Sequence, residues 1–574
     1  MAPSGWARCM RRDAVDVGAV AESVVPCSTD LSSVRNRVAR AAIPAAVETD
    51  ERRLFVLSEE EGLPAPSEAT SAGAAVGPRA GVTTWLCTGG AFDEGWRTIQ
   101  GVASHFVERV RALQPRGPYR VAGVGLAGVV AYEVALQLLG ADAAVELVGV
   151  VETECLEWDT RRALMRASLD DEVARPSEQT RHLRRAVLDY EVPESPLVVH
   201  LVVRGGPGPS ARAAGWERVL RRPGQIRPIE VAEGEGAFHG TAVEALRNVI
   251  NAQPPPTGGA GGSRAFEWGH QSLFPIHVGR PDVPHLLCVP GAGAGVTDFV
   301  SLASLLGDDV SVHGFQSRGM EGTMVPYATV QAAAGAYLHE LASLRAADGV
   351  HLVGHSFGGW IAFEMALRLQ EAGRRVLSLT LLDSEWPLAD GRRGREYTRV
   401  DALMKLVSLH EQAAGRTLDI RASDFEDRDS AAQLELLHSG LVRVGMMPAR
   451  LSWEALRGPV RSFEAAIRTR YSPDDKFLGP TTLVLVPESD ESEDRVGPRF
   501  ESTTAGWRSV APRLQFVRGG GNHVRLLKPP HIAAIADLLR GCLSRPGDDR
   551  HPGAGLPFAE PLGAHPSPRS IGRR

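Results

Sequence analysis

Apolar positions along this chain follow two patterns, short apolar runs that are typical of buried parallel strands and apolar residues at helical spacing. The clearest case lies in the C-terminal half, where the run His351–Gly354 precedes Ile361, Met365 and Leu369, and Gly373 ends the pattern. Further apolar runs predict strands at 285–289, 377–382, 482–486 and 514–517. We therefore expect an α/β fold with a mostly parallel central sheet flanked by helices.

Three stretches interrupt these patterns. Residues 1–80 are rich in Ala, Ser, Pro and Gly and show little periodicity, so we expect them to be mostly flexible. The tract Gln-Pro-Pro-Pro-Thr-Gly-Gly-Ala-Gly-Gly-Ser cannot bury apolar surface and predicts a linker over 253–270. The tail 546–574, rich in Pro, Gly, Arg and His, is expected to be disordered. Two folded blocks remain, 82–252 and 271–545.

The two blocks resemble each other. The segment 352–370, LVGHSFGGWIAFEMALRLQ, aligns with 121–139, VAGVGLAGVVAYEVALQLL, at a shift of 231 residues, and the same register sets Asp383 opposite Glu152. We interpret the blocks as copies of one ancestral unit rather than as convergent α/β patterning.

A second match lies earlier in each block. Cys288 in HLLCVPGAG aligns with Cys87 in TWLCTGGA at a shift of 201 residues. The difference between the two shifts predicts that the first block has lost 30 residues, about one strand with its loops.

The strand at 351–354 runs directly into Gly-His-Ser-Phe-Gly and then into the predicted helix. Strand, Gly-x-Ser-x-Gly and helix together predict a nucleophile elbow, in which the turn is too tight for side chains two residues either side of the serine. The hydroxyl of Ser356 would then stand at a helix N-terminus, where the helix dipole favours developing negative charge. We predict Ser356 as a nucleophile in an α/β-hydrolase fold; a plain glycine turn is the alternative.

An oxyanion hole requires two backbone N–H groups. Phe357, which follows the serine, is predicted to supply one. The loop 289–295, Val-Pro-Gly-Ala-Gly-Ala-Gly, is predicted to supply the other from Ala292. A glycine loop also suits phosphate binding, but this one lacks the Lys and Ser/Thr of a P-loop.

The acid of such a site must follow a later strand, and two aspartates do so. Asp383 ends the run 377–382, and Asp490 comes just after 482–486. Both strand ends can reach a histidine in this fold class, so the residues alone leave both open.

The base is predicted to be His523, in the loop Gly-Gly-Gly-Asn-His that follows the last strand. His355, beside the serine, is expected to pack or to form a hydrogen bond. The chain order of serine, aspartate and histidine is that of α/β-hydrolases. Such a site requires neither a metal nor an organic cofactor.

Composition narrows the partners and the compartment. The 574 residues are 43% hydrophobic and 23% charged, with a net charge of −6, so a soluble protein without a nucleic-acid partner is expected. Six scattered cysteines without a Cys-x-x-Cys pair argue against a zinc site and against a disulfide framework. The N-terminal stretch lacks the apolar core of a signal peptide, and no apolar run is long enough for a membrane span. We expect a cytoplasmic protein.

Several stretches over 271–545 together resemble the thioesterase domains of nonribosomal peptide and polyketide synthases: SLFPI, HLLCVPGAGAGVTDF, FQSRG, LVGHSFGGWIAFEMA, LTLLDSE and GGGNHVRLL. In that family the acid follows the strand after the nucleophile helix, which corresponds to Asp383 here. The family also has a helical lid between acid and histidine. The resemblance therefore implies Asp383 as the acid and a lid at about 388–471, where leucines are frequent.

The resemblance further implies the reaction. The substrate would be an acyl or peptidyl chain held as a thioester on the phosphopantetheine of a carrier protein. Release as acid or as ring would serve secondary-metabolite biosynthesis. The chain shows no convincing carrier domain, so the carrier is expected in trans. A small-molecule carboxylesterase or lipase, or a non-catalytic scaffold that docks a carrier, are the rival hypotheses.

The first block is interpreted as a degenerate copy. Gly125 stands at the serine position, Glu152 at the acid position and His239 at the base position. Without a hydroxyl or thiol at residue 125, covalent acyl transfer is excluded there. A structural role, carrier docking, and acid–base chemistry by Glu152 and His239 alone remain open.

Overall fold

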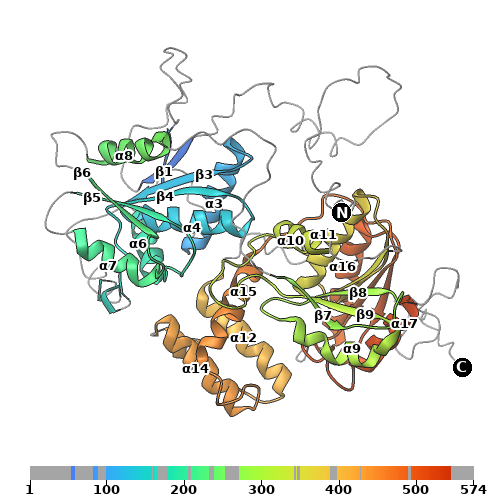
Figure 1. Cartoon of the computed structure of the whole chain (residues 1–574). Helices are drawn as coiled ribbons and strands as arrows, with labels where there is room; N and C mark the ends of the chain where they lie inside the picture. Colours follow the sequence, from blue (N-terminus) through green and yellow to red (C-terminus); the bar gives the residue numbers. More distant parts are fainter. Residues whose placement is uncertain are drawn as a thin grey trace, which may run out of the picture. The chain divides into compact units, whose positions relative to one another are not determined.

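In this computed structural model the chain divides into two compact units, and their boundary falls within 253–270, the segment predicted as a linker. That segment and the tail 546–574 lie outside the described residues. The structure describes residues 53–58, 82–87, 98–157, 159–161, 163–164, 178–204, 209–231, 238–252, 271–341, 344, 349–387, 397–426, 428–488 and 493–543. Each unit contains one sheet (Figure 1).

The second unit has a seven-stranded sheet in the order β13-β12-β11-β10-β8-β9-β7. Neighbouring strands pair in parallel except at one edge, where β7 is antiparallel to β9. The strands are β7 (Leu273–His277), β8 (His285–Val289), β9 (Ser311–Phe315), β10 (Val350–His355), β11 (Val376–Leu382), β12 (Thr481–Leu485) and β13 (Leu514–Arg518). The predicted fold, a mostly parallel sheet flanked by helices, is confirmed.

Helices cover both faces of this sheet, which explains why its central strand β10 is buried along its whole length. On one face α9 (Val300–Leu306) and α17 (Ile532–Leu543) pack together over β8 to β13 in one apolar cluster. The other face carries α10 (Val330–Leu341), α11 (Phe357–Glu371) and α16 (Glu493–Val510). These two layers position the ends of the strands, where the candidate site lies.

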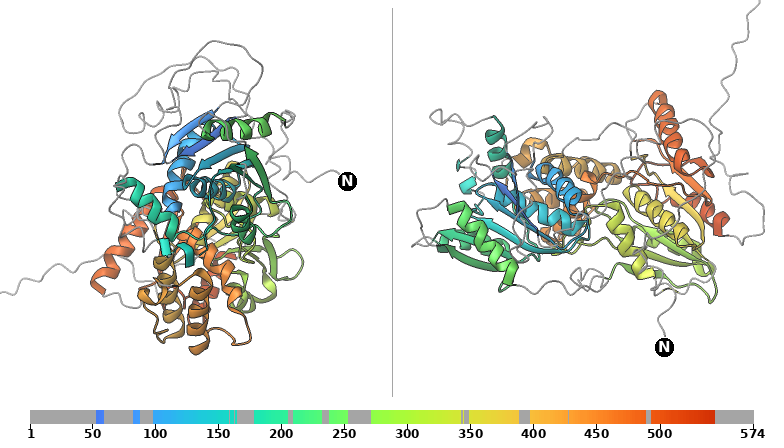
Figure 2. Two further views of the ribbon diagram at one scale, coloured as in Figure 1. Left: turned by 90° about the vertical axis from the view of Figure 1, so that its left-hand side faces the viewer. Right: turned by 90° about the horizontal axis from the view of Figure 1, so that it is seen from above.

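A helical insertion separates β11 from β12 and forms its own apolar cluster. It contains α12 (Arg399–Ala414), α13 (Ala422–Glu426), α14 (Ser430–Arg443), η3 (Trp453–Leu456) and α15 (Arg457–Arg468). A capping box formed by Thr398 and Asp401 begins α12, and Gly415 ends it in the left-handed conformation. In Figures 1 and 2 these orange helices form a group beside the strands of the second sheet.

The first unit has a six-stranded, fully parallel sheet in the order β2-β1-β3-β4-β5-β6. Its α8 packs on one face in an apolar cluster with the strands, and α3, α4, α6 and α7 lie on the other (Figure 1). The strands are β1 (Leu54–Ser58), β2 (Val82–Leu86), β3 (Tyr119–Val124), β4 (Val145–Val151), β5 (Val199–Arg204) and β6 (Ile226–Val231). The helices are α3 (Ile99–Leu113), α4 (Ala127–Gly140), α6 (Glu178–Asp189), α7 (Pro209–Val219) and α8 (Phe238–Ala252).

The start of the first unit corrects the prediction. Strand β1 pairs with β3 as β8 pairs with β10, and β2 pairs with β1 as β9 pairs with β8. The block therefore extends upstream of 82 into the region expected to be flexible. The strand expected to be lost, the counterpart of β9, is present as β2, and β1 is the counterpart of β8. Cys87 follows the counterpart of β9, so its match with Cys288 is not a structural equivalence. Pairing within the sheet decides which strands correspond, and a short local likeness does not.

Close packing at one glycine predicts a large stability effect. A Cβ atom at Gly359 would lie 1.8 Å from the Oγ of Ser384, and one at Gly128 would lie 1.9 Å from the Oγ1 of Thr153. We expect Gly359→Ala to lower the free energy of unfolding by about 1–3 kcal/mol, because the buried hydroxyl has to move. Thermal unfolding of Gly497→Ala, a helical position with open space, provides the control. Equal midpoints for the two variants would contradict this packing argument.

Candidate active site

Ser356 lies at the turn between β10 and α11 with φ 55° and ψ −126°, in the region that side chains seldom adopt. Such a backbone conformation costs about 1–3 kcal/mol and persists only where its surroundings hold it. The N–H of Ser356 donates to the carbonyl of Leu382 at 2.8 Å, and its own carbonyl accepts from the N–H of Gly359 at 2.9 Å. The buried hydroxyl of Ser384 donates to the same carbonyl at 2.6 Å.

The glycines around the serine are required by close backbone approach. A Cβ atom at Gly354 would lie 2.4 Å from the carbonyl oxygen of Gly358. One at Gly358 would lie 2.3 Å from the carbonyl oxygen of Val289. Larger residues therefore cannot occupy the two glycine positions of the Gly-x-Ser-x-Gly motif without a shift of the backbone.

The loop predicted to contribute to an oxyanion hole lies against the serine. A Cβ atom at Gly291 would lie 3.3 Å from the Cβ atom of Ser356, and the N–H of Ala294 closes a turn on the carbonyl of Gly291 at 3.2 Å. Ala292 lies at the tip of this turn, and Phe357 is the first residue of α11. The structure thus brings the loop with Ala292 and the helix start with Phe357 to the same serine.

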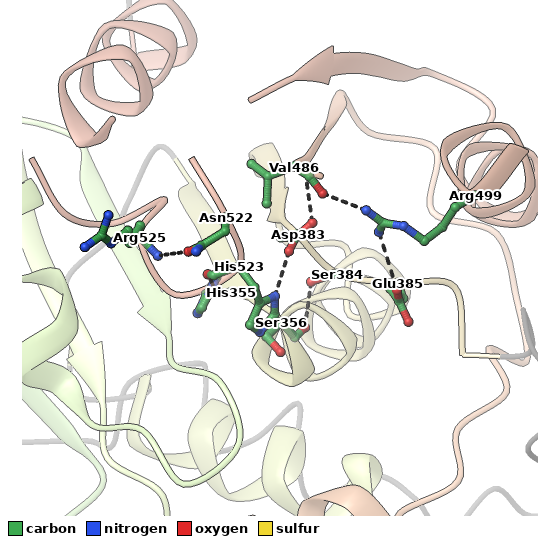
Figure 3. Close-up of polar contacts among 10 residues, drawn as sticks. All are labelled: His355, Ser356, Asp383, Ser384, Glu385, Val486, Arg499, Asn522, His523 and Arg525. Carbon is green, nitrogen blue, oxygen red and sulfur yellow. Dashed lines mark hydrogen bonds and ion pairs between the residues drawn. The ribbon is translucent and has the colours of Figure 1, made fainter. Parts of the chain in front are cut away.

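His523 and Asp383 are joined directly. The Nδ1–H of His523 donates to Oδ2 of Asp383 at 2.6 Å, and the other carboxylate oxygen accepts from the N–H of Val486 at 3.1 Å (Figure 3). Asp383 follows β11 with φ 46°, and its N–H donates to the carbonyl of Val484 at 2.7 Å. Asp490, the alternative acid, lies outside the described residues.

The contact between Asp383 and His523 shifts their pKa values in opposite directions. Burial raises the pKa of Asp383, but the hydrogen bond and charge of His523 and the bond from Val486 outweigh it, so that pKa is lowered from its ordinary value. Burial lowers the pKa of His523, but Asp383, with help from Glu385 and Glu488, outweighs that effect and raises it. The carboxylate is therefore ionised and accepts the hydrogen bond from Nδ1–H, which leaves Nε2 of the ring as the basic nitrogen.

Two further side chains, which the sequence did not point to, donate hydrogen bonds to backbone carbonyls next to Asp383. Arg499 donates to the carbonyl of Val486 at 2.7 Å and forms an ion pair with Glu385 at 3.5 Å (Figure 3). The indole N–H of Trp507 donates to the carbonyl of Ser384 at 2.9 Å. No local motif marks these side chains, because they come from α16, more than a hundred residues after the acid.

The family model described as the thioesterase domain matches residues 93–195 and 284–434. The first segment lies in the first unit and the second contains Ser356 and Asp383. These segments belong to the thioesterase domain family. The split match is consistent with a tandem pair of thioesterase domains, of which the second carries the serine.

Relatives of these thioesterase domains are parts of much larger proteins. The chain is 25% identical over 312 residues to chondramide synthase cmdD of Chondromyces crocatus, 53% of this chain and 8% of that protein. It is 35% identical over 82 residues to nonribosomal peptide synthetase btyA of Aspergillus terreus, 14% of this chain and 9% of that protein. The Vlm2 thioesterase domain is 23% identical, with a TM-score of 0.35, over 47% of this chain and 96% of that structure. The chain thus spans a tenth or less of these two curated relatives.

The first thioesterase unit retains the support of the elbow without the serine. Gly125 has φ 61° and Glu152 has φ 51° at the positions of Ser356 and Asp383. The hydroxyl of Thr153 donates to the carbonyl of Gly125 at 2.9 Å, as Ser384 does in the second unit. The indole of Trp216 donates to the carbonyl of Thr153 at 3.1 Å, as Trp507 does to Ser384.

The acid position of the first unit is also held in the same way. The N–H of Arg204 donates to Oε1 of Glu152 at 2.8 Å, as that of Val486 does to Asp383. His239 lies in α8, but its side chain is outside what the structure describes. The first unit therefore keeps an elbow with a carboxylate beside it and offers no hydroxyl at the turn.

Two kinds of feature are not found among the described residues. They contain no group of three or more His, Cys, Asp or Glu side chains that could hold a metal ion. Within the same part of the chain, no helix combines the length and the apolar character needed to cross a membrane.

Proposed function

We propose that this protein is a serine thioesterase that releases an acyl or peptidyl chain from the phosphopantetheine of a carrier protein. Ser356 would be the nucleophile, His523 the general base and Asp383 the acid that orients it. The observation that carries the proposal is the 2.6 Å bond between His523 and Asp383 at the strand ends beside the elbow. That bond fixes the tautomer in which the free ring nitrogen can accept a proton.

The acylation step follows from these roles. As Oγ of Ser356 attacks the thioester carbonyl, its proton passes to Nε2 of His523. The carbonyl oxygen gains negative charge, which the N–H groups of Ala292 and Phe357 would stabilise. The carbon–sulfur bond then breaks, and the proton on His523 passes to the departing pantetheine thiol. The product is an acyl ester on Ser356.

Release of the chain uses the same groups in reverse. His523 takes a proton from water, or from a hydroxyl or amine within the chain itself, and that oxygen or nitrogen attacks the ester. The ester bond breaks, Ser356 regains its proton from His523, and the chain leaves as an acid or as a ring. Exclusion of water by the helical insertion would favour the ring.

The helical insertion is suited to act as a lid over this site. Ala292 packs against its apolar cluster, and a Cβ atom at Gly293 would lie 2.7 Å from the carbonyl oxygen of Pro459 and 2.9 Å from the Cβ of Phe463. On the other side, the guanidinium of Arg525 donates to the carbonyl of Ala413 at 3.4 Å. The insertion therefore contacts both the loop with Ala292 and the loop with His523.

A carrier protein in trans, in secondary-metabolite biosynthesis, completes the proposal. The relatives named as a synthase and as a nonribosomal peptide synthetase support this setting. The first unit would take no part in covalent transfer, because Gly125 has no nucleophilic atom.

The substrate class can be tested with one acyl chain presented in three forms. We expect kcat/KM for octanoyl-phosphopantetheinyl carrier protein to exceed that for p-nitrophenyl octanoate by at least about tenfold, since docking of the carrier contributes binding energy. Octanoyl-N-acetylcysteamine, a thioester without a carrier, separates thioester preference from carrier recognition. A higher value for the aryl ester would favour a small-molecule esterase. Turnover of none of the three, without labelling by a fluorophosphonate, would favour a scaffold.

A further inference from the structure

The two units provide an internal comparison. The contacts that both share, from the Ser384 and Thr153 hydroxyls and the two indoles, hold the elbow whether or not it carries a serine. A polar contact found at the serine-bearing elbow alone is therefore a candidate for a role in the reaction. His355 makes such a contact, and the residue at the equivalent position of the first unit is Val124.

His355 connects the elbow to the loop that carries the predicted base. Its Nε2 lies 3.0 Å from the carbonyl oxygen of His523, and the two rings are 5.0 Å apart between centroids. A carbonyl can only accept, so the proton of His355 resides on Nε2. The bond spans 168 residues of sequence and joins the end of β10 to the middle of the histidine loop (Figure 3).

The surroundings keep His355 a neutral donor. Burial, together with His523 and Lys528, lowers its pKa to about 4, although Asp383 and the bond to the carbonyl of His523 act in the opposite direction. A neutral ring places no second positive charge beside His523 when that residue takes up a proton. The contact is therefore compatible with each state of the base.

We propose that His355 is a positioning residue for the general base. Its Nε2–H holds the backbone of His523 so that one ring nitrogen stays on Asp383 and the other stays directed at Ser356. The inference rests on the proposed function, because it presupposes that His523 acts as the base. His355 does not exchange protons with the substrate in this role.

The test compares two substitutions at the same position. His355→Val introduces the residue of the first unit and removes the donor, whereas the side-chain amide of His355→Gln can donate to the same carbonyl. We expect the valine variant to react with a fluorophosphonate about 10- to 100-fold more slowly. On octanoyl-N-acetylcysteamine we expect a lower kcat rather than a higher KM. The glutamine variant is expected to recover most of the rate.

A pH profile distinguishes positioning from a structural role. Without the bond from His355, contact between His523 and Asp383 weakens, so the raised pKa of the base should fall back and the acidic limb of kcat/KM should move to lower pH. The glutamine variant should retain the wild-type limb. His351→Val is the matched control, since it removes another buried histidine of β10, one bonded to Ser378 at 2.8 Å and four residues from the elbow end. That control is expected to lower the unfolding midpoint without changing the labelling rate.

Two results would overturn the inference while the proposed function stands. One is a valine variant that is labelled at the wild-type rate, and the other is a glutamine variant as slow as the valine variant with an unchanged pH limb. Failure of the wild-type chain to be labelled or to turn over any ester would instead reject the proposed function itself.

Discussion

Substitution of Ser356 by alanine is expected to abolish labelling by a fluorophosphonate and to lower thioester hydrolysis by at least about a thousandfold. The reason is that, under the proposed function, the oxygen of Ser356 forms the acyl ester, while the proposed oxyanion donors remain. Alanine lacks only the oxygen, so the strained turn and its three backbone bonds should persist. Intact-protein mass spectrometry of the inhibitor adduct measures the first effect, and release of free thiol measures the second.

The control for this change is Ser304→Ala, at an exposed serine of α9. It should be labelled at the wild-type rate and to one adduct per chain. An adduct on the Ser356→Ala protein with wild-type kinetics would show that the nucleophile is another residue.

Replacing Asp383 by asparagine should lower kcat by roughly four orders of magnitude, as loss of the orienting carboxylate does in comparable sites. An amide in place of the carboxylate can direct an N–H at Nδ1 of His523, which favours the wrong tautomer of the ring. The bond from Val486 to the remaining oxygen can be kept, so a local effect is expected. Single-turnover kinetics with octanoyl-N-acetylcysteamine measures the rate of acylation.

The same variant has a pH signature. Under the proposed function activity requires neutral His523, whose pKa is raised above 6.5 by Asp383, so the wild-type rate should fall as pH decreases through a value above 6.5. Without the carboxylate that pKa drops, and the limb of the residual activity should move to lower pH. Asp383→Glu, which keeps the charge, should retain the limb at the higher pH. An acidic limb at the same pH in the asparagine variant would contradict the pairing.

Much of the second unit could be predicted from its sequence because its signals are local. A short apolar run, a glycine-framed serine and a helical pattern are contiguous in the chain, and the structure has β10, Ser356 and α11 in that order. The choice between Asp383 and Asp490 was different in kind, since both follow strands. It depended on family resemblance, and the roles of the three site residues remain predictions.

What the sequence could not provide depends on pairing between distant segments. Strand β1 has five residues, all buried, and lies far upstream of its partner β3. Its run Leu-Phe-Val-Leu was the available signal, but the composition of the surrounding region obscured it. The supports from Arg499 and Trp507 likewise come from a helix remote in sequence, so no spacing could have identified them.

The positive φ shared by Gly125 and Ser356 has an evolutionary consequence. Glycine adopts that conformation without a steric penalty, whereas serine is held there against one of about 1–3 kcal/mol. A duplicated copy released from selection for turnover therefore becomes more relaxed when this serine mutates to glycine. The reverse mutation restores the strain, and it restores activity only if a partner histidine is also in place. Loss of the serine from one copy is thus favoured by backbone conformation and its return is disfavoured. A tandem protein of this design therefore tends to keep one copy without a nucleophile.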